Sequence, residues 1–459
     1  MLKSVENSSA RLGYYSFVFG LLTFVGSLFP QFEIPVFLSV IVVIVSFSFF
    51  ILSFSTSKWQ TYSRKSKKRI LWGLFFLPFV LYIPVNLGLL SIGIVELKLH
   101  DFGAYYNAAV RWLHNAPLYQ TTQEIPALDA QISGSMPYLY PPIVVLIFVP
   151  FTFLPPVISG VVWDLTILTF LIWSVSMLIS TFNVTINRRK KLLLYFAVAS
   201  FGPTITWMKA GQISGLLAAL LCLSGATLRS NRHGLSGAFT TLGGIVKPFY
   251  ATSGAHLLRH RKRFLSAVVS GAAILLFGLL VFGVDTHLEY LDVLRQGKGW
   301  ETATGPTNWN AGHFNPFYIL GPLKHLPRII IVLGTAGLAL YSNKTEIPIE
   351  YIFALGVSIV PLAGPTTNTL ALSASIPAIL MVGFYELEHN GEFPKILAIS
   401  TLLIHIHPYT VEFVSKFGPQ IYPPLKILTP VIPLLQPALY GMGLLVGYLV
   451  YRSWKNPVV

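Results

Sequence analysis

The polar run LHDFGAYYNAAVRWLHNAPLYQ, residues 99–120, separates two long apolar stretches and contains Asp101, the residue best suited to acid–base chemistry. From Tyr105 the apolar residues recur at helical spacing until Asn115-Ala116-Pro117, which predicts a short amphipathic helix lying along the membrane surface. Asp101 is therefore expected just before the first turn of this helix, at the boundary with water.

Two roles are open to Asp101 in that position. Aspartate is favoured as a helix N-cap, although Ala104 cannot complete a capping box. Flanked by His100, Tyr105 and Tyr106, the carboxylate could instead accept the proton of a sugar hydroxyl as that hydroxyl attacks. Spacing alone does not choose between these roles.

Two lysines in apolar surroundings are a second chemical signal. Lys209 and Gln212 lie between two apolar stretches in ASFGPTITWMKAGQISGLL, and Lys247 lies inside the apolar run GGIVKPFY. A lysine in an apolar segment is costly and calls for an anionic partner, and a lipid phosphate fits because its oxygens bind an ammonium. Lys209 could instead extend its stem to reach water. Lys247 is about 12 residues from either basic flank, which favours phosphate binding.

Other polar residues give weaker signals. Asp164 lies near the start of the apolar stretch 157–182, which predicts an interfacial position. The segment ETATGPTNWNAGHFNPF offers Asn308, Asn310 and His313 for contacts with a sugar or an acceptor, although asparagine and glycine are also typical of turns. The single cysteine and the isolated histidine pairs predict no metal site and no cofactor, and no Walker loop or nucleophile elbow is present.

The elements that position these residues are membrane helices. Of the 459 residues, 54% are hydrophobic and 11% are charged, compared with about 25% charged residues in soluble domains. Apolar stretches long enough to span a bilayer recur along the chain, so we predict an all-α polytopic membrane protein with 11 to 14 membrane segments. We treat residues 1–459 as one integral domain with an N-terminal helical hairpin (13–54), a central module (70–284) and a C-terminal helical part (285–459).

The net charge of +15 is explained by orientation in the membrane and not by nucleic-acid binding. Lysine and arginine concentrate in short loops at 58–69, 188–191, 229–232 and 259–263, the pattern expected of cytoplasmic loops. Both termini are then cytoplasmic, and the two long polar loops (96–141 and 285–315) face outward from the cell membrane. Two assignments of the chain between these loops remain open.

In the first assignment, residues 142–154 do not cross the membrane and residues 234–257 form a re-entrant hairpin broken at Lys247-Pro248. All four basic clusters are then cytoplasmic. In the second assignment both segments cross, which moves the clusters at 188–191 and 229–232 outside. The distribution of charge favours the first.

Taken together, these motifs resemble a known family. The HDFGAYYNAAVRWLHNAPLYQ run is followed by YLYPPIVVLIFVPFTFLP, VVWDL, WMKAGQISGLLAALLCLSGATLRSNRHGLSGAF and IVKPF. This order resembles the polyprenyl-phosphate-mannose-dependent mannosyltransferases of glycosyltransferase family 87, in the GT-C superfamily, over roughly residues 70–284.

The resemblance implies a GT-C-like bundle of many helices, with two outer loops that carry short amphipathic helices. It also implies transfer of a hexose, mannose in the family, with inversion, from a polyprenyl- or dolichyl-phosphate sugar to a lipid or glycan acceptor outside. The family's base falls on Asp101, its Tyr-Pro-Pro element on Tyr140 and the following prolines, its Gly-Gln on Gly211-Gln212 and its lysine on Lys247. Lys209 and Gln212 would assist Lys247 at the donor phosphate, and Tyr105, Tyr106 and Tyr140 would contact sugar or acceptor.

Two other readings share parts of this pattern. A multi-pass transporter or lipid flippase would also have many helices and an intramembrane lysine, but it predicts inverted repeats and a mid-membrane charge network. A ligase or polymerase of lipid-linked glycans would share the outward-facing geometry. The two sizeable outer loops favour a transferase over a transporter.

Overall fold

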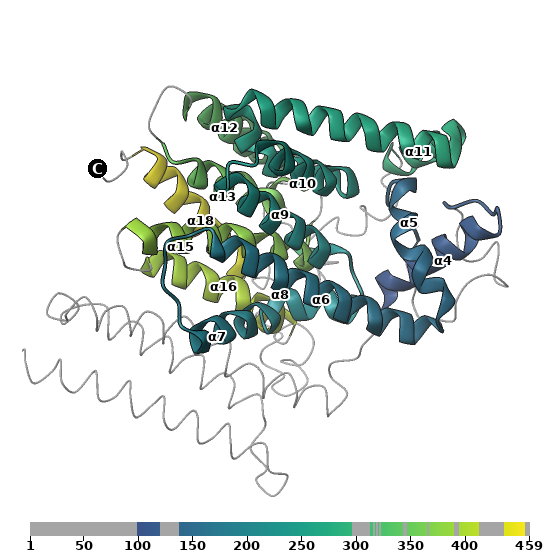
Figure 1. Ribbon diagram of the computed structural model, residues 1–459, viewed down its shortest axis with the longest axis horizontal. Helices are drawn as coiled ribbons and strands as arrows, with labels where there is room; N and C mark the ends of the chain where they lie inside the picture. Colours follow the sequence, from purple (N-terminus) through teal and green to yellow (C-terminus); the bar gives the residue numbers. More distant parts are fainter. Residues whose placement is uncertain are drawn as a thin grey trace, which may run out of the picture. The chain divides into compact units, whose positions relative to one another are not determined.

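The computed structural model describes residues 99–119, 137–295, 313–314, 317, 320, 323–342, 347–364, 367–389, 394–412 and 436–454. The chain divides into two compact units, Met1–Glu96 and Leu97–Val459, and all described residues belong to the second (Figure 1). The predicted N-terminal hairpin at 13–54 and the basic cluster at 58–69 lie outside the described residues.

The second unit is built almost entirely of helices, which confirms the predicted all-α polytopic class. In chain order its elements are α4 (His100–Leu113), η2 (Pro142–Val144), α5 (Val145–Phe148), η3 (Val149–Phe153), α6 (Pro156–Ser180), α7 (Arg188–Ala199), α8 (Gly202–Ala210), α9 (Ser214–Arg229), α10 (His233–Val246), η4 (Pro248–Arg259), α11 (Arg261–Arg295), β1 (His313–Phe314), α12 (His325–Tyr341), α13 (Ile349–Ser358), α14 (Val360–Ala363), β2 (Thr367–Asn368), η8 (Thr369–Ala374), α15 (Ser375–His389), α16 (Lys395–Glu412) and α18 (Pro437–Trp454). The short strands β1 and β2 pair antiparallel.

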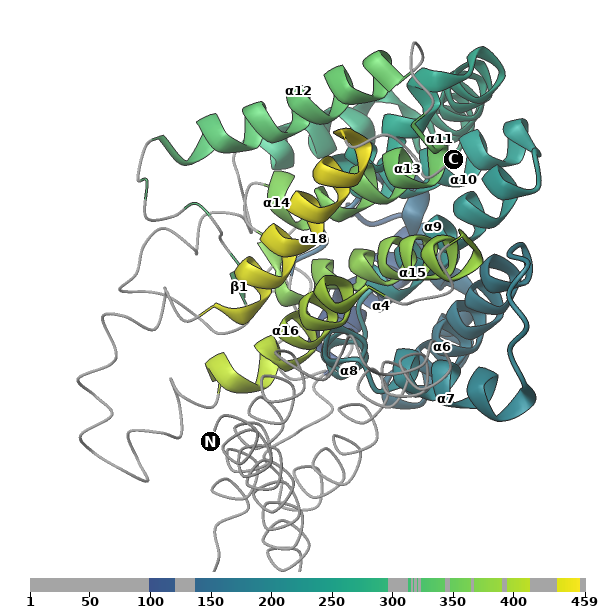
Figure 2. The same ribbon diagram turned by 90° about the vertical axis from the view of Figure 1, so that its left-hand side faces the viewer.

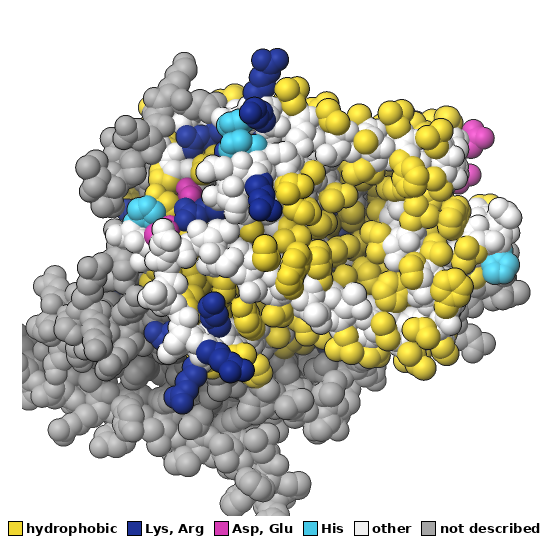
Figure 3. All heavy atoms as spheres, viewed as in Figure 1, with side chains coloured by type: hydrophobic (Ala, Val, Ile, Leu, Met, Phe, Trp, Pro, Cys, Tyr) yellow, Lys and Arg dark blue, Asp and Glu magenta, His cyan; other side chains and the backbone are white. Residues whose placement is uncertain are grey.

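Three stretches of the described chain are long and apolar enough to cross a membrane: α6, α11 and the continuous η8–α15. On α11 large apolar side chains point outward, including Val269, Leu276 and Leu280, the last of which is 85% exposed. Figure 3 shows a broad hydrophobic surface over the middle of the molecule, between α11 and α6. This surface is the one that a bilayer would cover.

Helices α6 and α9 pack side by side and run in the same direction. A side chain at Gly215, near the start of α9, would meet Ile167 of α6, and one at Gly225 would meet Leu178. At the far end, the Arg229 guanidinium donates to the Thr181 carbonyl oxygen at 3.2 Å. Both helices therefore end together, next to the basic first turn of α7, and we call this the basic end of the bundle.

The chain turns back at Lys247-Pro248, as the first assignment predicts. Helix α10 stops at Lys247-Pro248, because proline cannot continue the helical hydrogen bonds, and the chain returns as the 3₁₀ helix η4. The two arms run antiparallel: the rings of His233 and His260 stack with centroids 3.9 Å apart, and Ser236 is hydrogen-bonded to His256 at 3.2 Å. Residues 229–232 and 259–263 therefore lie at the same end, and Lys247 lies at the tip of the hairpin.

Residues 142–153 do not form a single spanning helix. They fold as η2, α5 and η3, which together extend about 22 Å at the rises of 3₁₀ and α helices, less than a hydrocarbon core of roughly 30 Å. The segment packs against α4. Its shortness agrees with the assignment that keeps the basic clusters on one side.

Helix α11 runs from the basic end toward α4 and bends at Gly283, whose φ of 77° suits glycine. Its last part, after the bend, is the helical start of the second polar loop. Near the bend the rings of Trp112 and Phe282 lie 5.4 Å apart, so the two polar loops meet at the same end of the bundle.

The C-terminal helices close the bundle behind α9. Helices α16 and α18 lie side by side, and α13 packs against both α15 and α18 (Figure 2). Ion pairs join these helices at the basic end: Arg229 contacts Glu350 at 2.5 Å and Glu388 at 2.8 Å, and Arg452 contacts Glu386 at 3.0 Å. Because the pairs are largely buried, breaking one of them would leave an uncompensated charge inside the bundle.

Candidate active site

The position of Asp101 follows from how α4 is attached to the bundle. The helix was predicted to begin at Tyr105, but it begins at His100. Asp101 therefore lies in the first turn and not before it. Leu99 precedes the helix in a left-handed conformation (φ 46°), and no side chain caps it, so the N-cap interpretation of Asp101 is wrong. A carboxylate in the first turn is stabilised by the partial positive charge of the helix N-terminus.

The predicted surface helix is in fact mostly buried. Phe102 through Ala109 and Arg111 are covered, because α4 packs against α5, η3, α6 and α8. The periodic pattern correctly identified a helix but not its surroundings. Asp101 itself retains a side-chain exposure of 16%, enough to be reached from outside.

A close contact with the end of α8 fixes the start of α4. The Leu99 backbone N–H donates to the Lys209 carbonyl oxygen at 3.0 Å. Next to it, Gly211 adopts a φ of 67°, and a Cβ there would lie 2.5 Å from Phe102 Cβ, so only glycine permits this approach. The Trp163 indole N–H also donates to the Gly211 carbonyl oxygen at 3.1 Å, which anchors the junction to α6. The predicted Gly-Gln element thus holds Asp101 in place.

Asp101, Gln212 and Lys247 come together at this junction. The Gln212 side chain and the Lys247 ammonium both lie close enough to the Asp101 carboxyl group to lower its pKa. The Lys247 ammonium donates to Gln212 Oε1 and to Ser214 Oγ, both at 3.2 Å. The hairpin α10–η4 therefore brings its tip from the basic end to the first turn of α4.

Burial raises the pKa of the Asp101 carboxyl above its usual value. The neighbouring His100, the Lys247 ammonium and the Gln212 side chain each lower that pKa, in decreasing order, without cancelling the effect of burial. His100 Nε2 lies 3.6 Å from Asp101 Oδ1. A carboxylate with a raised pKa is a stronger base than a solvated one, which suits it to accept a proton.

Tyr140 is the predicted tyrosine that faces this cluster. The Lys247 ammonium lies 5.7 Å from the centroid of its ring, and the Tyr105 hydroxyl donates to the Tyr140 hydroxyl at 2.9 Å. Tyr140 remains partly exposed.

The other two tyrosines have a different environment from the one predicted. Tyr105 is 1% exposed and stacks on Phe148, and Tyr106 is 8% exposed and donates to the Leu154 carbonyl oxygen at 3.1 Å. Neither offers a free ring face to a sugar. Their predicted role as sugar contacts is therefore replaced by a structural one: Tyr105 orients Tyr140, and Tyr106 ties α4 to the segment before α6.

Two further predictions concern charged residues. In the described part of the chain, no hydrogen bond links the Lys209 ammonium to Asp101 or Lys247; its backbone carbonyl is what joins α8 to α4. Asp164 is 3% exposed, and within the described residues neither carboxyl oxygen has a hydrogen-bond partner. Helix α6 starts eight residues before Asp164, at Pro156, and packs this face against other helices, while the interfacial position of Asp164 stays a prediction.

The second polar loop is connected to the candidate active site through strand β1. Asn308 and Asn310 lie outside the described residues, while His313 lies in β1, where its backbone pairs with Asn368 of β2. Strand β2 leads directly into η8, whose Ser373 hydroxyl donates to the Ser214 carbonyl oxygen at 3.3 Å. The loop is thus connected to the junction that carries Gln212 and Lys247.

Ser214 and Ser373 are the site residues that sequence reasoning missed. A serine two positions after Gln212 was a usable signal, because it begins α9 next to the predicted phosphate-binding residue. Ser373 had no such signal, since it comes from the C-terminal part, which the sequence characterised only as a helical series. Ser214 Oγ also donates to Gln212 Oε1, so the lysine, amide and hydroxyl form one polar cluster.

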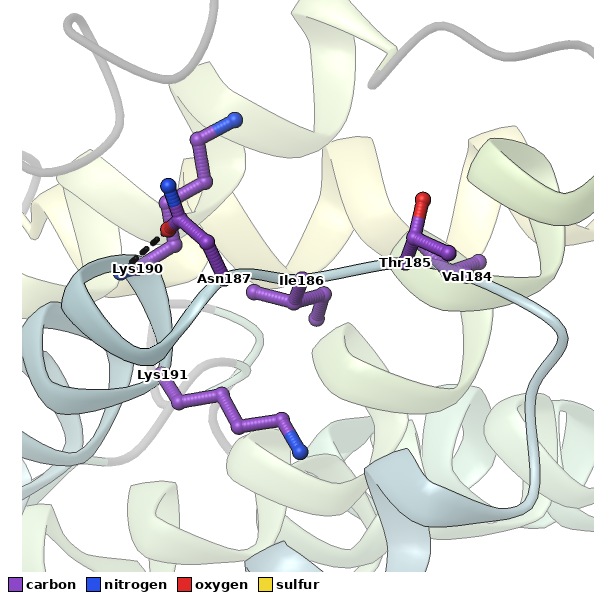
Figure 4. Close-up of a pocket in the computed structure, with 6 residues that line it drawn as sticks. All are labelled: Val184, Thr185, Ile186, Asn187, Lys190 and Lys191. Carbon is purple, nitrogen blue, oxygen red and sulfur yellow. Dashed lines mark hydrogen bonds between the residues drawn. The ribbon is translucent and has the colours of Figure 1, made fainter.

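A recess at the basic end is separate from this cluster. It is lined by Val184–Asn187, Lys190 and Lys191, and the Asn187 side-chain oxygen accepts from the Lys190 backbone N–H at 3.0 Å (Figure 4). Helix α6, about 38 Å long at helical rise, lies between the recess and the first turn of α4. The recess therefore belongs to the N-cap of α7 and not to the candidate active site.

The sequence profile of glycosyltransferase family 87 matches residues 138–344, just under half of the chain. No curated protein and no solved structure gave a significant match. The matched range contains Tyr140, Gln212 and Lys247, whereas Asp101 precedes it and joins it through folding. Residues 138–344 are thus similar to glycosyltransferase family 87, and glycosyl transfer is the activity that this similarity indicates.

Proposed function

We propose that this protein transfers a hexose, mannose in the first instance, from a polyprenyl- or dolichyl-phosphate sugar to a lipid or glycan acceptor, with Asp101 as general base. The observation that carries the proposal is the convergence of Asp101, Gln212 and Lys247 at one end of the bundle. The basic clusters at 229–232 and 259–263 lie at the opposite end. If those clusters are cytoplasmic, the reaction takes place on the outer face of the cell membrane.

The donor phosphate fits the Lys247 cluster. An ammonium in an apolar segment needs an anionic partner, and a phosphate oxygen accepts readily from it. Helix α9 begins at Ser214, beside Lys247, and directs the positive end of its dipole to the same place. The prenyl chain would remain in lipid along the apolar surface between α6 and α11.

The chemistry is a single displacement. The acceptor hydroxyl gives its proton to the Asp101 carboxylate while its oxygen bonds to the anomeric carbon of the sugar. The bond from that carbon to the phosphate oxygen breaks on the opposite face, so the configuration inverts, and the polyprenyl phosphate leaves with the electron pair. Lys247 stabilises the departing charge, and no second carboxylic acid is required because phosphate is a good leaving group.

Similarity to a glycosyltransferase family supports this proposal over a transporter or flippase. The buried ion pairs of the described chain lie at the basic end, where Arg229 and Arg452 hold the C-terminal helices, and not halfway along the bundle. A substrate pathway through the membrane would need polar groups at mid-depth.

The proposal predicts sugar transfer by the purified chain. In lipid vesicles it should move radiolabelled mannose from polyprenyl-phosphate-mannose to a cell-envelope lipid or glycan fraction, and the labelled product should have inverted anomeric configuration. As a comparison, vesicles that contain the protein and a labelled lipid or solute are tested for movement of that label across the bilayer. If no polyprenyl-phosphate sugar supports transfer while a labelled lipid or solute crosses the bilayer, the transporter reading replaces this one.

A second prediction concerns pH. Because Asp101 acts only when deprotonated and burial raises its pKa, kcat/KM should fall on the acid side with a midpoint above 3.8, the ordinary value for aspartate. Below that midpoint the rate should drop about tenfold for each pH unit. The measurement is kcat/KM against pH, with the folded fraction followed at each pH. A profile that stays flat down to pH 4 would contradict the role of Asp101.

A further inference from the structure

A series of tyrosine rings leads away from the candidate active site toward the second polar loop. Tyr105 and Tyr140 have ring centroids 5.1 Å apart, Tyr138 lies 5.9 Å from Tyr140, and Tyr119 lies 5.8 Å from Tyr138. The series ends at Tyr290 of α11, 6.1 Å from Tyr119. Four of these rings lie within residues 105–140, and only Tyr290 of α11 is distant from them in sequence.

The tyrosine rings of the series differ in burial: some are buried in the core and some are partly exposed. Tyr105 and Tyr138 are 1% and 2% exposed, so they belong to the core, whereas Tyr119, Tyr140 and Tyr290 are partly exposed. Two hydrogen bonds fix the geometry: the Tyr119 hydroxyl donates to the Tyr140 carbonyl oxygen at 2.7 Å, and the Tyr138 hydroxyl donates to the Pro141 carbonyl oxygen at 2.9 Å. Tyr119 and Tyr140 are therefore held in place without a ligand, and Tyr290 packs beside the Tyr119 ring.

The bend at Gly283 brings Tyr290 to this surface. The φ of 77° at Gly283 redirects the last part of α11, and the contact between Trp112 and Phe282 fixes the bend against α4. On the same turn as Tyr290, Leu288 is 53% exposed and faces away from the series. Tyr290 is thus turned inward by the backbone while its neighbours remain at the surface.

The partly exposed rings start next to the candidate base, Asp101. The Tyr140 hydroxyl lies within electrostatic range of both the Asp101 carboxyl and the Tyr290 hydroxyl, and Glu289 lies within the same range of Tyr119. An acceptor that places its hydroxyl at Asp101 therefore has these rings within reach of the rest of the molecule. Fixed aromatic faces edged by hydroxyl and carboxylate groups match the apolar C–H face and polar rim of a sugar ring.

We propose that Tyr119, Tyr140 and Tyr290 form the acceptor subsite of this protein, and that the acceptor presents a saccharide to it. The inference rests on the proposed function and deepens it, because it selects a glycan among the possible acceptors. Rings that merely anchored the protein at the membrane interface would have no effect on acceptor binding.

The test separates the two substrates. In Tyr290→Ala the acceptor KM should rise about 5- to 30-fold, the loss typical of truncating an aromatic contact in a binding site. The donor KM, and the slow release of free sugar from the donor to water, should stay at the wild-type level. Tyr290→Phe keeps the ring and should stay within about twofold of wild type. The matched control is Leu288→Ala, an apolar truncation two residues away.

An independent measurement reports the contact itself. Saturation-transfer NMR with a methyl mannose disaccharide as the probe should show transfer from aromatic protons to sugar protons in the wild type and in Tyr290→Phe, and a clearly weaker transfer in Tyr290→Ala. An unchanged acceptor KM in Tyr290→Ala, or an equal loss of transfer to acceptor and to water, would overturn the subsite. Wild-type protein that binds the disaccharide but transfers no sugar would instead refute the proposed function and leave the subsite standing.

Discussion

Replacing Asp101 with asparagine should reduce sugar transfer by about 100- to 10,000-fold, the usual contribution of a positioned general base. Asparagine has the same shape and remains next to Gln212, but it cannot take the proton of the acceptor hydroxyl. The residual rate would come from proximity and from Lys247. The measurement is kcat/KM for transfer from polyprenyl-phosphate-mannose, with both substrates varied.

The fold of this variant should be intact. Burial disfavours the ionised Asp101 carboxyl, so a neutral amide there should not lower the midpoint of thermal unfolding in detergent. Asp285→Asn is the matched control, because Asp285 is exposed on α11 and outside the polar cluster; it should transfer sugar at the wild-type rate. Full activity in Asp101→Asn, or an equal loss in Asp285→Asn, would remove Asp101 from the mechanism.

The sequence predicts the class of fold well, because long apolar stretches have few alternatives to membrane helices. It also predicts the break of the hairpin, since Lys247-Pro248 removes a helical hydrogen-bond donor in an otherwise apolar run. What it could not predict is that the returning arm is a 3₁₀ helix or that His233 and His260 stack at its base. Those features depend on packing between segments and not on local pattern.

In the candidate site, too, the residue types were predictable from the sequence and the tertiary contacts were not. Asp101, Gln212 and Lys247 are conspicuous because charged and amide groups are rare in this chain, and the fold brings them together. Tyr106 illustrates the limit: a tyrosine beside a candidate base suits a sugar, but its burial against the segment before α6 is a tertiary property.

The junction of α4 and α8 also depends on tertiary contacts. Helix α4 starts at His100 and not at Tyr105 because Leu99 is held by the Lys209 carbonyl and by the close approach of Phe102 to Gly211. Periodicity counts apolar positions and cannot register such contacts. The same contacts join Asp101 to the family-matched region, which begins only at residue 138.

Replacing Lys247 with methionine should lower kcat/KM for the lipid-phosphate donor by about 10- to 100-fold, the loss of one hydrogen bond to a charged group. Methionine fills a similar volume and suits an apolar segment, so the midpoint of thermal unfolding should not fall. Lys247→Arg restores the charge and should recover part of the activity. Lys262→Met is the matched control, because Lys262 is exposed at the basic end, and it should behave as wild type.

The pH profile of Lys247→Met tests whether Lys247 acts in the same site as Asp101. The Lys247 ammonium lowers the pKa of Asp101, so removing it should raise that pKa further and move the acid limb of kcat/KM to higher pH. In Lys247→Arg the positive charge remains and the limb should return toward its wild-type position. A lower rate with an unmoved acid limb would show that Lys247 and Asp101 do not act in the same site, since two groups within electrostatic range cannot titrate independently.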